Sequence, residues 1–446
     1  MRTPATETRA LGLVMCTALV VGNTVGMGIF MLPASLAPYG LNAVPAWLIT
    51  AAGSIFIAWV FAGLARTFPD DDGPIAYSGR AFGGGVAFTL MWCYWVSTWV
   101  TNAVLATGVV GYLSMFFPVL GVNHWLAALT ALSLLWLFVL INVRGVRAAG
   151  GVQVLSSVLK LLPLLGIIVL GVWVLLAPHA QPVVHVPPTP LSFSGVIAAS
   201  AVALYAMLGV ESAALPAGRV RDPARTIPRA TFIGTLVVAV ICFCVSLLPI
   251  VLIPQAELAA SNAPFADLFT RFLGSGSGKV LAAFVIVSGL GCLNGWTLIL
   301  GEITVSFARH GAFPQALGKV NSHGAPTLAF VVTGLFASIM MISSYNDSMA
   351  GAFTFLSVVV TAANVPLYLG CALAVLVLWQ RGKIPHPGAR ELRWVAAAFI
   401  ATVYCVWVSI GFGGKSLLWA AALCAVGLPV YWWYAYVRRD AITARA

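Results

Sequence analysis

The 446-residue sequence contains few charged residues. Lys and Arg account for 23 residues and Asp and Glu for 12, which together make about 8% of the chain. Soluble domains carry roughly 25% charged residues, so this chain cannot cover a surface that faces water. A soluble enzyme, a secreted scaffold and a disordered protein are therefore excluded.

The cysteines and histidines lack the spacing that a disulfide framework or a metal site needs. All eight cysteines lie within apolar runs, and none forms a C-x-x-C pair. The six histidines are scattered over connecting segments. We therefore predict no metal site and no other cofactor. No clustered catalytic groups indicate an enzyme, and no phosphate-binding motif is present that would couple ATP.

Apolar residues, by contrast, dominate the chain. Ala, Val, Ile, Leu, Met, Phe, Trp, Tyr and Cys make up 61% of it. They form twelve runs, and a membrane-spanning helix needs about 20 residues. The runs are 11–37, 41–66, 86–117, 124–143, 151–177, 194–218, 229–254, 279–308, 326–345, 351–379, 393–412 and 416–437. The sequence therefore predicts an all-α integral membrane protein with twelve transmembrane helices.

The basic residues are distributed unevenly between the two sides of such a protein. An even number of spans places both termini on one side. Only Arg271, Lys279 and Lys415 fall on the opposite side, and Lys160 lies inside the fifth span. The remaining nineteen of the 23 Lys and Arg residues lie on the side of the termini. The positive-inside rule then predicts cytoplasmic termini in the inner (plasma) membrane. It also explains the net charge of +11 without a nucleic-acid partner.

One internal repeat relates two of the predicted spans. Gly26–Ala34 in the first span and Gly209–Ala217 in the sixth share Gly, Leu, Pro and Ala at an offset of 183 residues. The offset covers five helices, an odd number, so the second copy would be inverted in the membrane. Inverted repeats that begin with broken helices place the substrate site of many transporters at those breaks. This predicts one transporter domain over residues 1–446, with repeats at 11–177 and 194–379 and two additional helices at 393–437.

The first span contains residues that favour local unwinding. Gly22, Gly26 and Gly28 lie near the middle of the membrane beside Asn23 and Thr24, and each glycine weakens a helix by about 1 kcal/mol relative to alanine. Amides freed at the start of the second half-helix would bind an anionic group such as a carboxylate. The alternative is a helix-packing face, since Gly22 and Gly26 form a G-x-x-x-G motif.

Charged residues deep in a span are costly and are candidates for function. Glu211 could receive a substrate ammonium or carry a proton; the alternative is a structural hydrogen bond to the unwound backbone. Glu302 lies nearer a helix end, where a structural role is favoured. Lys160 either extends to the membrane interface or places its ammonium between the first, fifth and eighth spans, in place of a bound cation.

Polar and aromatic side chains in other spans complete the set of candidates. Asn102, Ser97, Thr98 and Thr101 make a polar patch on the third span. Tyr205 and Trp296 could hold a substrate cation on their ring faces. The alternative for each aromatic residue is packing against lipid or the core, because aromatics make up 11% of the chain.

Six motifs follow one another along nearly the whole chain: Gly22–Pro33, Asp72–Gly83, Leu208–Ala213, Arg221–Pro228, Gly291–Trp296 and Gly311–Pro314. In this order they resemble the basic amino acid/polyamine antiporters of the amino acid–polyamine–organocation superfamily, in particular its arginine/agmatine antiporters. The resemblance implies a leucine-transporter-like fold of twelve helices with an inverted repeat, often dimeric, which works by alternating access. It also implies an amino acid or amine as substrate and membrane lipid as surroundings.

The resemblance also assigns site residues by position. Asn23, Gly26, Met27 and Gly28 fall where the break in the first span meets the substrate carboxylate and amine. Residues that fall at the pocket or its gates are Asn102, Leu105, Tyr205, Glu211, Trp296 and Ser357, with Tyr94 at the position of a gate tyrosine.

Four positions depart from the arginine/agmatine antiporters. Met27 replaces a small hydroxyl residue, Tyr205 replaces a tryptophan, and Tyr368 is only a displaced counterpart of the gate tyrosine in the tenth span. Lys160 resembles the fifth-span lysine of proton-coupled and heteromeric relatives.

The sequence thus predicts a secondary active amino-acid transporter. The favoured mode is antiport of a cationic amino acid (arginine, lysine or ornithine) for its amine or for another amino acid. The alternative is a proton-coupled permease for neutral or broad-range amino acids, with Lys160 or Glu211 as the group that carries the proton.

Overall fold

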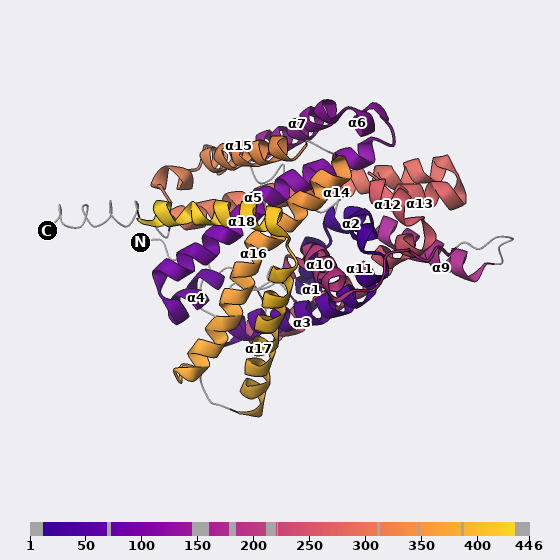
Figure 1. Ribbon diagram of the computed structural model, residues 1–446. Coiled ribbons are helices and arrows are strands. Elements are labelled where there is room, and N and C mark those ends of the chain that lie inside the picture. Colours follow the sequence, from indigo (N-terminus) through magenta and orange to yellow (C-terminus); the bar gives the residue numbers. More distant parts are fainter. Residues whose placement is uncertain are drawn as a thin grey trace.

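The computed structural model describes residues 12–68, 73–144, 160–177, 184–210, 220, 222–309, 313–345, 348–384 and 388–432. Its regular elements are all helices (Figure 1). In the first half of the chain they are α1 (Leu13–Thr24), α2 (Gly28–Leu36), η1 (Ala37–Asn42), α3 (Ala43–Thr67), α4 (Pro74–Phe82), α5 (Gly84–Leu113), α6 (Val119–Val122), α7 (His124–Val143), α9 (Leu161–Leu176), α10 (Phe193–Leu204) and η2 (Tyr205–Met207). In the second half they are α11 (Pro223–Leu252), α12 (Gln255–Ala260), α13 (Pro264–Leu273), α14 (Ser275–Arg309), η5 (Gln315–Gly318), α15 (Thr327–Ser344), α16 (Met349–Gln380), α17 (Ala389–Ile410) and α18 (Gly414–Ala425). The predicted all-α class is confirmed for these residues.

The helices follow the predicted apolar runs. Each of the twelve runs overlaps at least one of them. Across the described ranges, nine helical stretches of 18 to 40 residues are long and apolar enough to cross a membrane. Helices in the first, fifth and sixth runs, namely α1, α9 and α10, are apolar but shorter. The chain is therefore a polytopic membrane protein, and the count of twelve spans stays a prediction.

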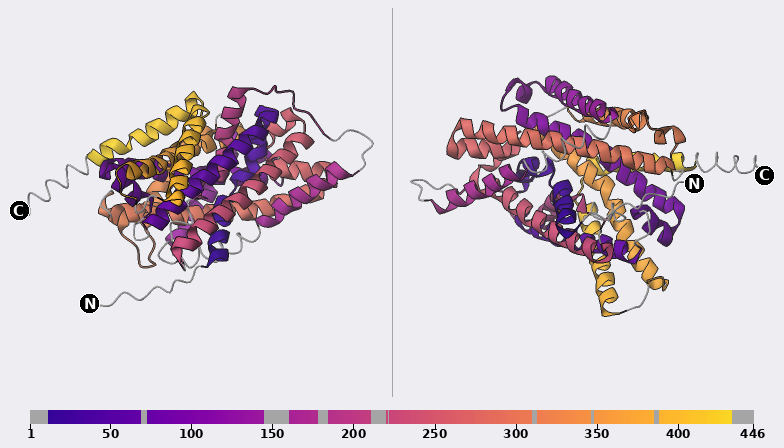
Figure 2. Two further views of the ribbon diagram at one scale, coloured as in Figure 1. Left: turned by 90° about the horizontal axis from the view of Figure 1, so that it is seen from below. Right: turned by 180° about the vertical axis from the view of Figure 1, so that it is seen from behind.

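Two long helices form the centre of the fold. In an 18-residue apolar stretch of α5, 94% of the residues are buried inside the protein, and in the corresponding stretch of α16, 83% are buried. In the apolar stretch that includes α18, only 11% are buried. Helix α5 packs against both α16 and α14, and it runs through the middle of the molecule, with α7 and α15 along one side (Figures 1 and 2). Large apolar side chains on the outer helices are exposed, as for Ile410 and Leu418. In a membrane such side chains face lipid, so the polar residues of α5 and α16 lie in the interior.

The first predicted span is interrupted, as its glycines predict. Helix α1 ends at Thr24 and α2 begins at Gly28, and Val25 between them has an extended backbone with φ −73° and ψ 90°. Gly22 remains helical, so the break lies after it. A Cβ atom at Gly28 would lie 2.6 Å from the ring of Tyr205. Only glycine therefore permits this close approach of α2 to Tyr205.

The sixth predicted span also loses its helical course near its middle. Helix α10 ends at Leu204 and a single 3₁₀ turn follows, after which Leu208 is extended with ψ 145°. Gly209 has φ 100°, a conformation that favours glycine, and its amide donates a hydrogen bond to the hydroxyl of Tyr368 (3.3 Å). Residues 211–219 lie outside the described part of the chain, so the fold does not place Glu211.

Glycines of α3 allow close packing of α17. A Cβ atom at Gly63 would lie 2.2 Å from the indole nitrogen of Trp394, and one at Gly53 would lie 2.3 Å from the ring of Tyr404. Both aromatic side chains are buried. Small residues at membrane helix interfaces give stability by letting the partner helix approach, and here two glycines ten positions apart (53 and 63) each receive one aromatic ring.

This packing predicts that Gly63→Ala lowers the melting temperature of the purified protein in detergent. The added methyl group collides with a buried indole, and overpacking of this kind costs about 1–3 kcal/mol. Gly276→Ala in α14 is the matched control, since no atom lies within 4 Å of its added Cβ and alanine favours a helix. Equal melting temperatures for the two variants would contradict the prediction.

Candidate functional site

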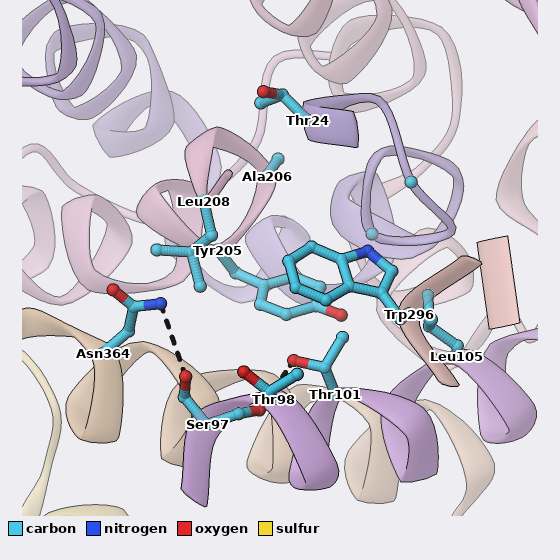
Figure 3. Close-up of a pocket in the computed structure, with 12 residues that line it drawn as sticks. Thr24, Ser97, Thr98, Thr101, Leu105, Tyr205, Ala206, Leu208, Trp296 and Asn364 are labelled. Atoms are coloured by element: carbon cyan, nitrogen blue, oxygen red, sulfur yellow. Dashed lines mark hydrogen bonds between the residues drawn. The ribbon is translucent and has the colours of Figure 1, made fainter. Parts of the chain in front are cut away.

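A cavity lies beside the break between α1 and α2, and segments far apart in the sequence enclose it (Figure 3). Its lining comprises Thr24, Gly26, Gly28, Ser97, Thr98, Thr101, Leu105, Tyr205, Ala206, Leu208, Trp296 and Asn364. These residues come from the break between α1 and α2, from α5, from η2 and the extended segment after it, and from α14 and α16. The cavity thus lies where both interrupted helices meet the two central ones. The structure brings together five predicted site residues in this lining, namely Gly26, Gly28, Leu105, Tyr205 and Trp296.

Two aromatic rings, those of Tyr205 and Trp296, lie at the centre of the cavity in Figure 3. Tyr205 packs edge-on against Phe353, with ring centroids 6.0 Å apart and an interplanar angle of 84°. The contact with Phe353 and the close approach of Gly28 both restrict the position of its ring. Trp296 is half-buried in α14. The faces of both rings can attract a cation.

Hydroxyl groups on one face of α5 line another side of the cavity. Ser97 and Thr98 both donate to the carbonyl of Tyr94 (2.7 and 2.8 Å), and Thr101 donates to the carbonyl of Ser97 (2.8 Å). The amide of Asn364 on α16 donates to the Ser97 hydroxyl (3.4 Å), which Figure 3 shows as a dashed line. Because the hydroxyl protons are already engaged, these groups offer the cavity their lone pairs.

Lys160 lies at the helix break. Its ammonium donates hydrogen bonds to the carbonyl of Gly22 and to that of Val25 (3.1 Å), and only 2% of the residue is exposed. The last carbonyls of a helix lack partners within it and carry partial negative charge. The ammonium of Lys160 satisfies one carbonyl in the last turn of α1 and that of Val25, the first residue of the break, from inside the protein. Extension of this side chain to the membrane interface is therefore excluded.

The other side of the break presents the start of α2. The first amides of a helix have no acceptor in their own helix and carry partial positive charge. Gly26 and Gly28 line the cavity at this point. The break therefore has opposite partial charges on its two sides: the carbonyls that Lys160 bonds at the end of α1, and the first amides of α2 beside the cavity.

Met27 is placed differently from its neighbours in the break. A Cβ atom at Gly108 would lie 2.7 Å from its Cγ, and one at Gly289 would lie 2.9 Å from its Sδ. The side chain is fully buried and packs between α5 and α14. Met27 is thus a core residue in this structure, and its side chain does not belong to the cavity lining.

Four other predicted residues, Asn102, Ser357, Tyr94 and Tyr368, are buried in the core and do not belong to the lining of this cavity. The Asn102 Oδ1 has no hydrogen-bond partner. Ser357 donates to the carbonyl of Thr354 (2.8 Å). The side chain of Asn23 and all of Glu211 lie outside what the structure describes.

The cavity also contains residues that the sequence did not single out. They are Asn364 and Ala206, together with Thr24, which entered the prediction only as a neighbour of Asn23, and Leu208, which entered only as the first residue of a motif. The signal for Asn364 was an amide inside the apolar run 351–379. Among the described residues, no group of three or more His, Cys, Asp or Glu side chains could hold a metal ion.

A partly polar cavity at an interrupted helix, enclosed by apolar helices, is typical of a secondary transporter. The comparison with protein families agrees, since a model described as "Amino acid permease" matches residues 11–436. The chain belongs to this amino acid permease family.

Relatives with assigned names cover almost the whole chain. A Bacillus subtilis (strain 168) protein with the provisional name arginine/ornithine antiporter is 31% identical, over 95% of this chain and 97% of the relative. A "Cadaverine/lysine antiporter" of Escherichia coli (strain K12) is 30% identical, over 96% and 95%. The "Putrescine transporter PotE" of the same strain is 27% identical, over 95% and 96%. The predicted family of basic amino acid and polyamine antiporters is confirmed.

Proposed function

We propose that this protein is an antiporter that exchanges a cationic amino acid for its amine or for another amino acid by alternating access. The observation that carries the proposal is the cavity at the helix break, with an amide-bearing helix start at one side and two aromatic faces within it. A cationic amino acid has the matching groups: a carboxylate for the amides and a cation for the rings. The names of the relatives, which concern arginine, ornithine, lysine, cadaverine and putrescine, support the same substrate class.

In this proposal Gly26 in the break and Gly28 at the start of α2 receive the carboxylate, with Asn23 and the backbone of Met27 contributing from the same segment. Trp296 and Tyr205 hold the cationic part, and Leu105 packs against the aliphatic chain. Asn102 and Ser357 belong to the layer behind the lining, and Glu211 meets the ammonium or carries a proton.

The proposal includes the predicted membrane architecture. Twelve spans would form inverted repeats at 11–177 and 194–379, with two more helices at 393–437. Both termini would lie in the cytoplasm, below the inner membrane. A homodimer in contact with membrane lipid is part of the same proposal, because the family resemblance implies it.

Alternating access needs a closed end, and the structure supplies a candidate. Phe30 packs edge-on against Tyr112 and Phe265, with ring centroids 6.5 and 6.0 Å apart. The hydroxyl of Tyr112 donates to the carbonyl of Phe30 (2.8 Å). We infer that this cluster closes one end of the pathway, while Tyr94, Tyr368, Lys160 and Glu211 take part in gating or proton coupling.

The test is counterflow into liposomes that contain the purified protein and unlabelled arginine. A panel of labelled amino acids and amines is presented outside. Uptake confined to arginine, lysine, ornithine and their amines is the expected result. Absence of uptake for every amino acid and amine, under any gradient, would overturn the proposal.

A second function is favoured by one observation, the buried ammonium of Lys160 at the helix break. A proton-coupled permease for neutral or broad-range amino acids could use this amine as its proton carrier. Net accumulation of neutral amino acids driven by a pH gradient, without any substrate inside the liposomes, would favour this function over exchange.

A further inference from the structure

Two asparagine side chains meet in the interior where α7 packs against α14. The Asn142 Nδ2 donates to the Asn294 Oδ1 (3.1 Å) and to the carbonyl of Phe138 in its own helix (2.9 Å). Asn142 is 1% exposed and Asn294 is 0% exposed. Neither residue lines the cavity, so the proposed function assigns this amide pair no part.

The amide pair lies on the opposite side of α14 from Trp296. Residues two positions apart in an α-helix are separated by about 200° around its axis, so Asn294 and Trp296 point in nearly opposite directions. Residues four positions apart share a face, and the thiol of Cys292 donates to the carbonyl of Val25 in the helix break (3.9 Å). One face of α14 therefore meets α7 through Asn294, and the other meets the break and the cavity through Cys292 and Trp296.

This arrangement lets the amide pair set the rotation of α14 about its axis. Apolar contacts have no preferred direction, whereas a hydrogen bond weakens steeply when its geometry is lost. A buried amide that loses its partner finds no water in the membrane interior to replace it. Because α14 is one continuous helix from Ser275 to Arg309, a rotation that parts Asn294 from Asn142 also displaces Trp296.

We propose that Asn142 is a positioning residue that acts through Asn294 to hold the indole of Trp296 in the cavity. The proposal rests on the proposed function, because it takes Trp296 as a residue that holds the cationic part of the substrate. Figure 3 shows this indole at the centre of the cavity beside Tyr205. Loss of the amide pair should therefore weaken substrate binding, although no group that contacts the substrate is removed.

The experiment is a double-mutant cycle on the apparent affinity for lysine. Affinity is measured on the purified full-length protein from the concentration dependence of its thermal stabilisation. Asn142→Leu keeps the approximate volume but removes the amide, and it should weaken lysine binding about fivefold, less than Trp296→Ala does. In the Trp296→Ala background the same substitution should have no further effect, because a ring that is absent cannot be misplaced. The factors of two independent residues would multiply instead.

The matched control is Trp136→Phe. Trp136 lies on the same helix as Asn142, and its indole donates to the hydroxyl of Ser338 on α15 (3.1 Å). The variant thus removes a hydrogen bond of α7 that does not reach α14, and it should keep the wild-type lysine affinity. Asn142→Ala, which removes the amide without adding bulk, replaces the leucine variant where that protein does not fold.

Three results would overturn the positioning role and leave the proposed function intact. They are wild-type lysine affinity without the Asn142 amide, factors that multiply in the double variant, and an equal loss of affinity in Trp136→Phe. A wild-type protein that lysine, arginine and ornithine all fail to stabilise would instead refute the proposed function and the positioning role with it.

Discussion

Replacing Lys160 by methionine is expected to reduce exchange by at least an order of magnitude. The methionine keeps most of the apolar stem but removes the donor for the carbonyls of Gly22 and Val25. A buried acceptor left unpaired costs about 1–3 kcal/mol, and each 1.4 kcal/mol changes a population about tenfold. The conformation with the observed helix break should therefore become scarce. The measurement is the initial rate of counterflow, normalised to the protein inserted in the liposomes.

Lys279→Met is the control for the loss of one positive charge, since Lys279 is exposed on α14. Its exchange rate should equal that of the wild type. A Lys160→Met protein that exchanges substrate at the wild-type rate would show that the break holds without the ammonium. Loss of exchange in both variants would point to net charge and contradict the role of the helix break.

Truncation of Trp296 is expected to give the second large effect. Trp296→Ala removes an aromatic wall of the cavity, and a cation–π contact contributes about 0.5–2 kcal/mol before the lost apolar contact is counted. We expect the lysine concentration that halves the uptake of labelled substrate to rise about tenfold or more. Trp296→Phe keeps a ring face and should raise that concentration by a smaller factor.

The comparison of the two Trp296 variants separates the effect of an aromatic ring on substrate binding from the effect of side-chain volume. Trp125→Ala serves as the control because Trp125 is exposed on α7 and does not line the cavity. The Trp125→Ala variant should leave the half-inhibiting lysine concentration unchanged. If Trp296→Ala and Trp296→Phe weakened competition equally, an aromatic contact with the cation would be the wrong explanation.

The sequence was most informative about local properties. The twelve apolar runs each overlap a helix, and the glycines of the first span mark a real interruption between Thr24 and Gly28. Hydropathy and helix weakening depend on residues close together in the chain, so both can be predicted without the fold. Motif order along the whole chain was sufficient to identify the family.

The candidate site was predicted less completely, for a physical reason. A span exposes side chains over its whole circumference, and the sequence does not state which side faces a cavity. Met27 and Gly28 are adjacent, yet Gly28 lines the cavity while Met27 packs between α5 and α14. Asn364 had no neighbouring motif, and only the contact with Ser97 on another helix reveals its place.

Composition, charge asymmetry and motif order thus determined by themselves that this chain is a multi-pass amino acid permease with a broken first helix. The tertiary structure alone decided that Lys160 turns inward to the carbonyls of Gly22 and Val25 at the helix break, and that Ser97 of α5 and Asn364 of α16 line one cavity. These facts depend on how far each helix is rotated about its axis and on which helix packs beside it. Rotation is set by contacts between segments more than a hundred residues apart, as between Lys160 and Gly22 at a separation of 138, and no local pattern encodes them.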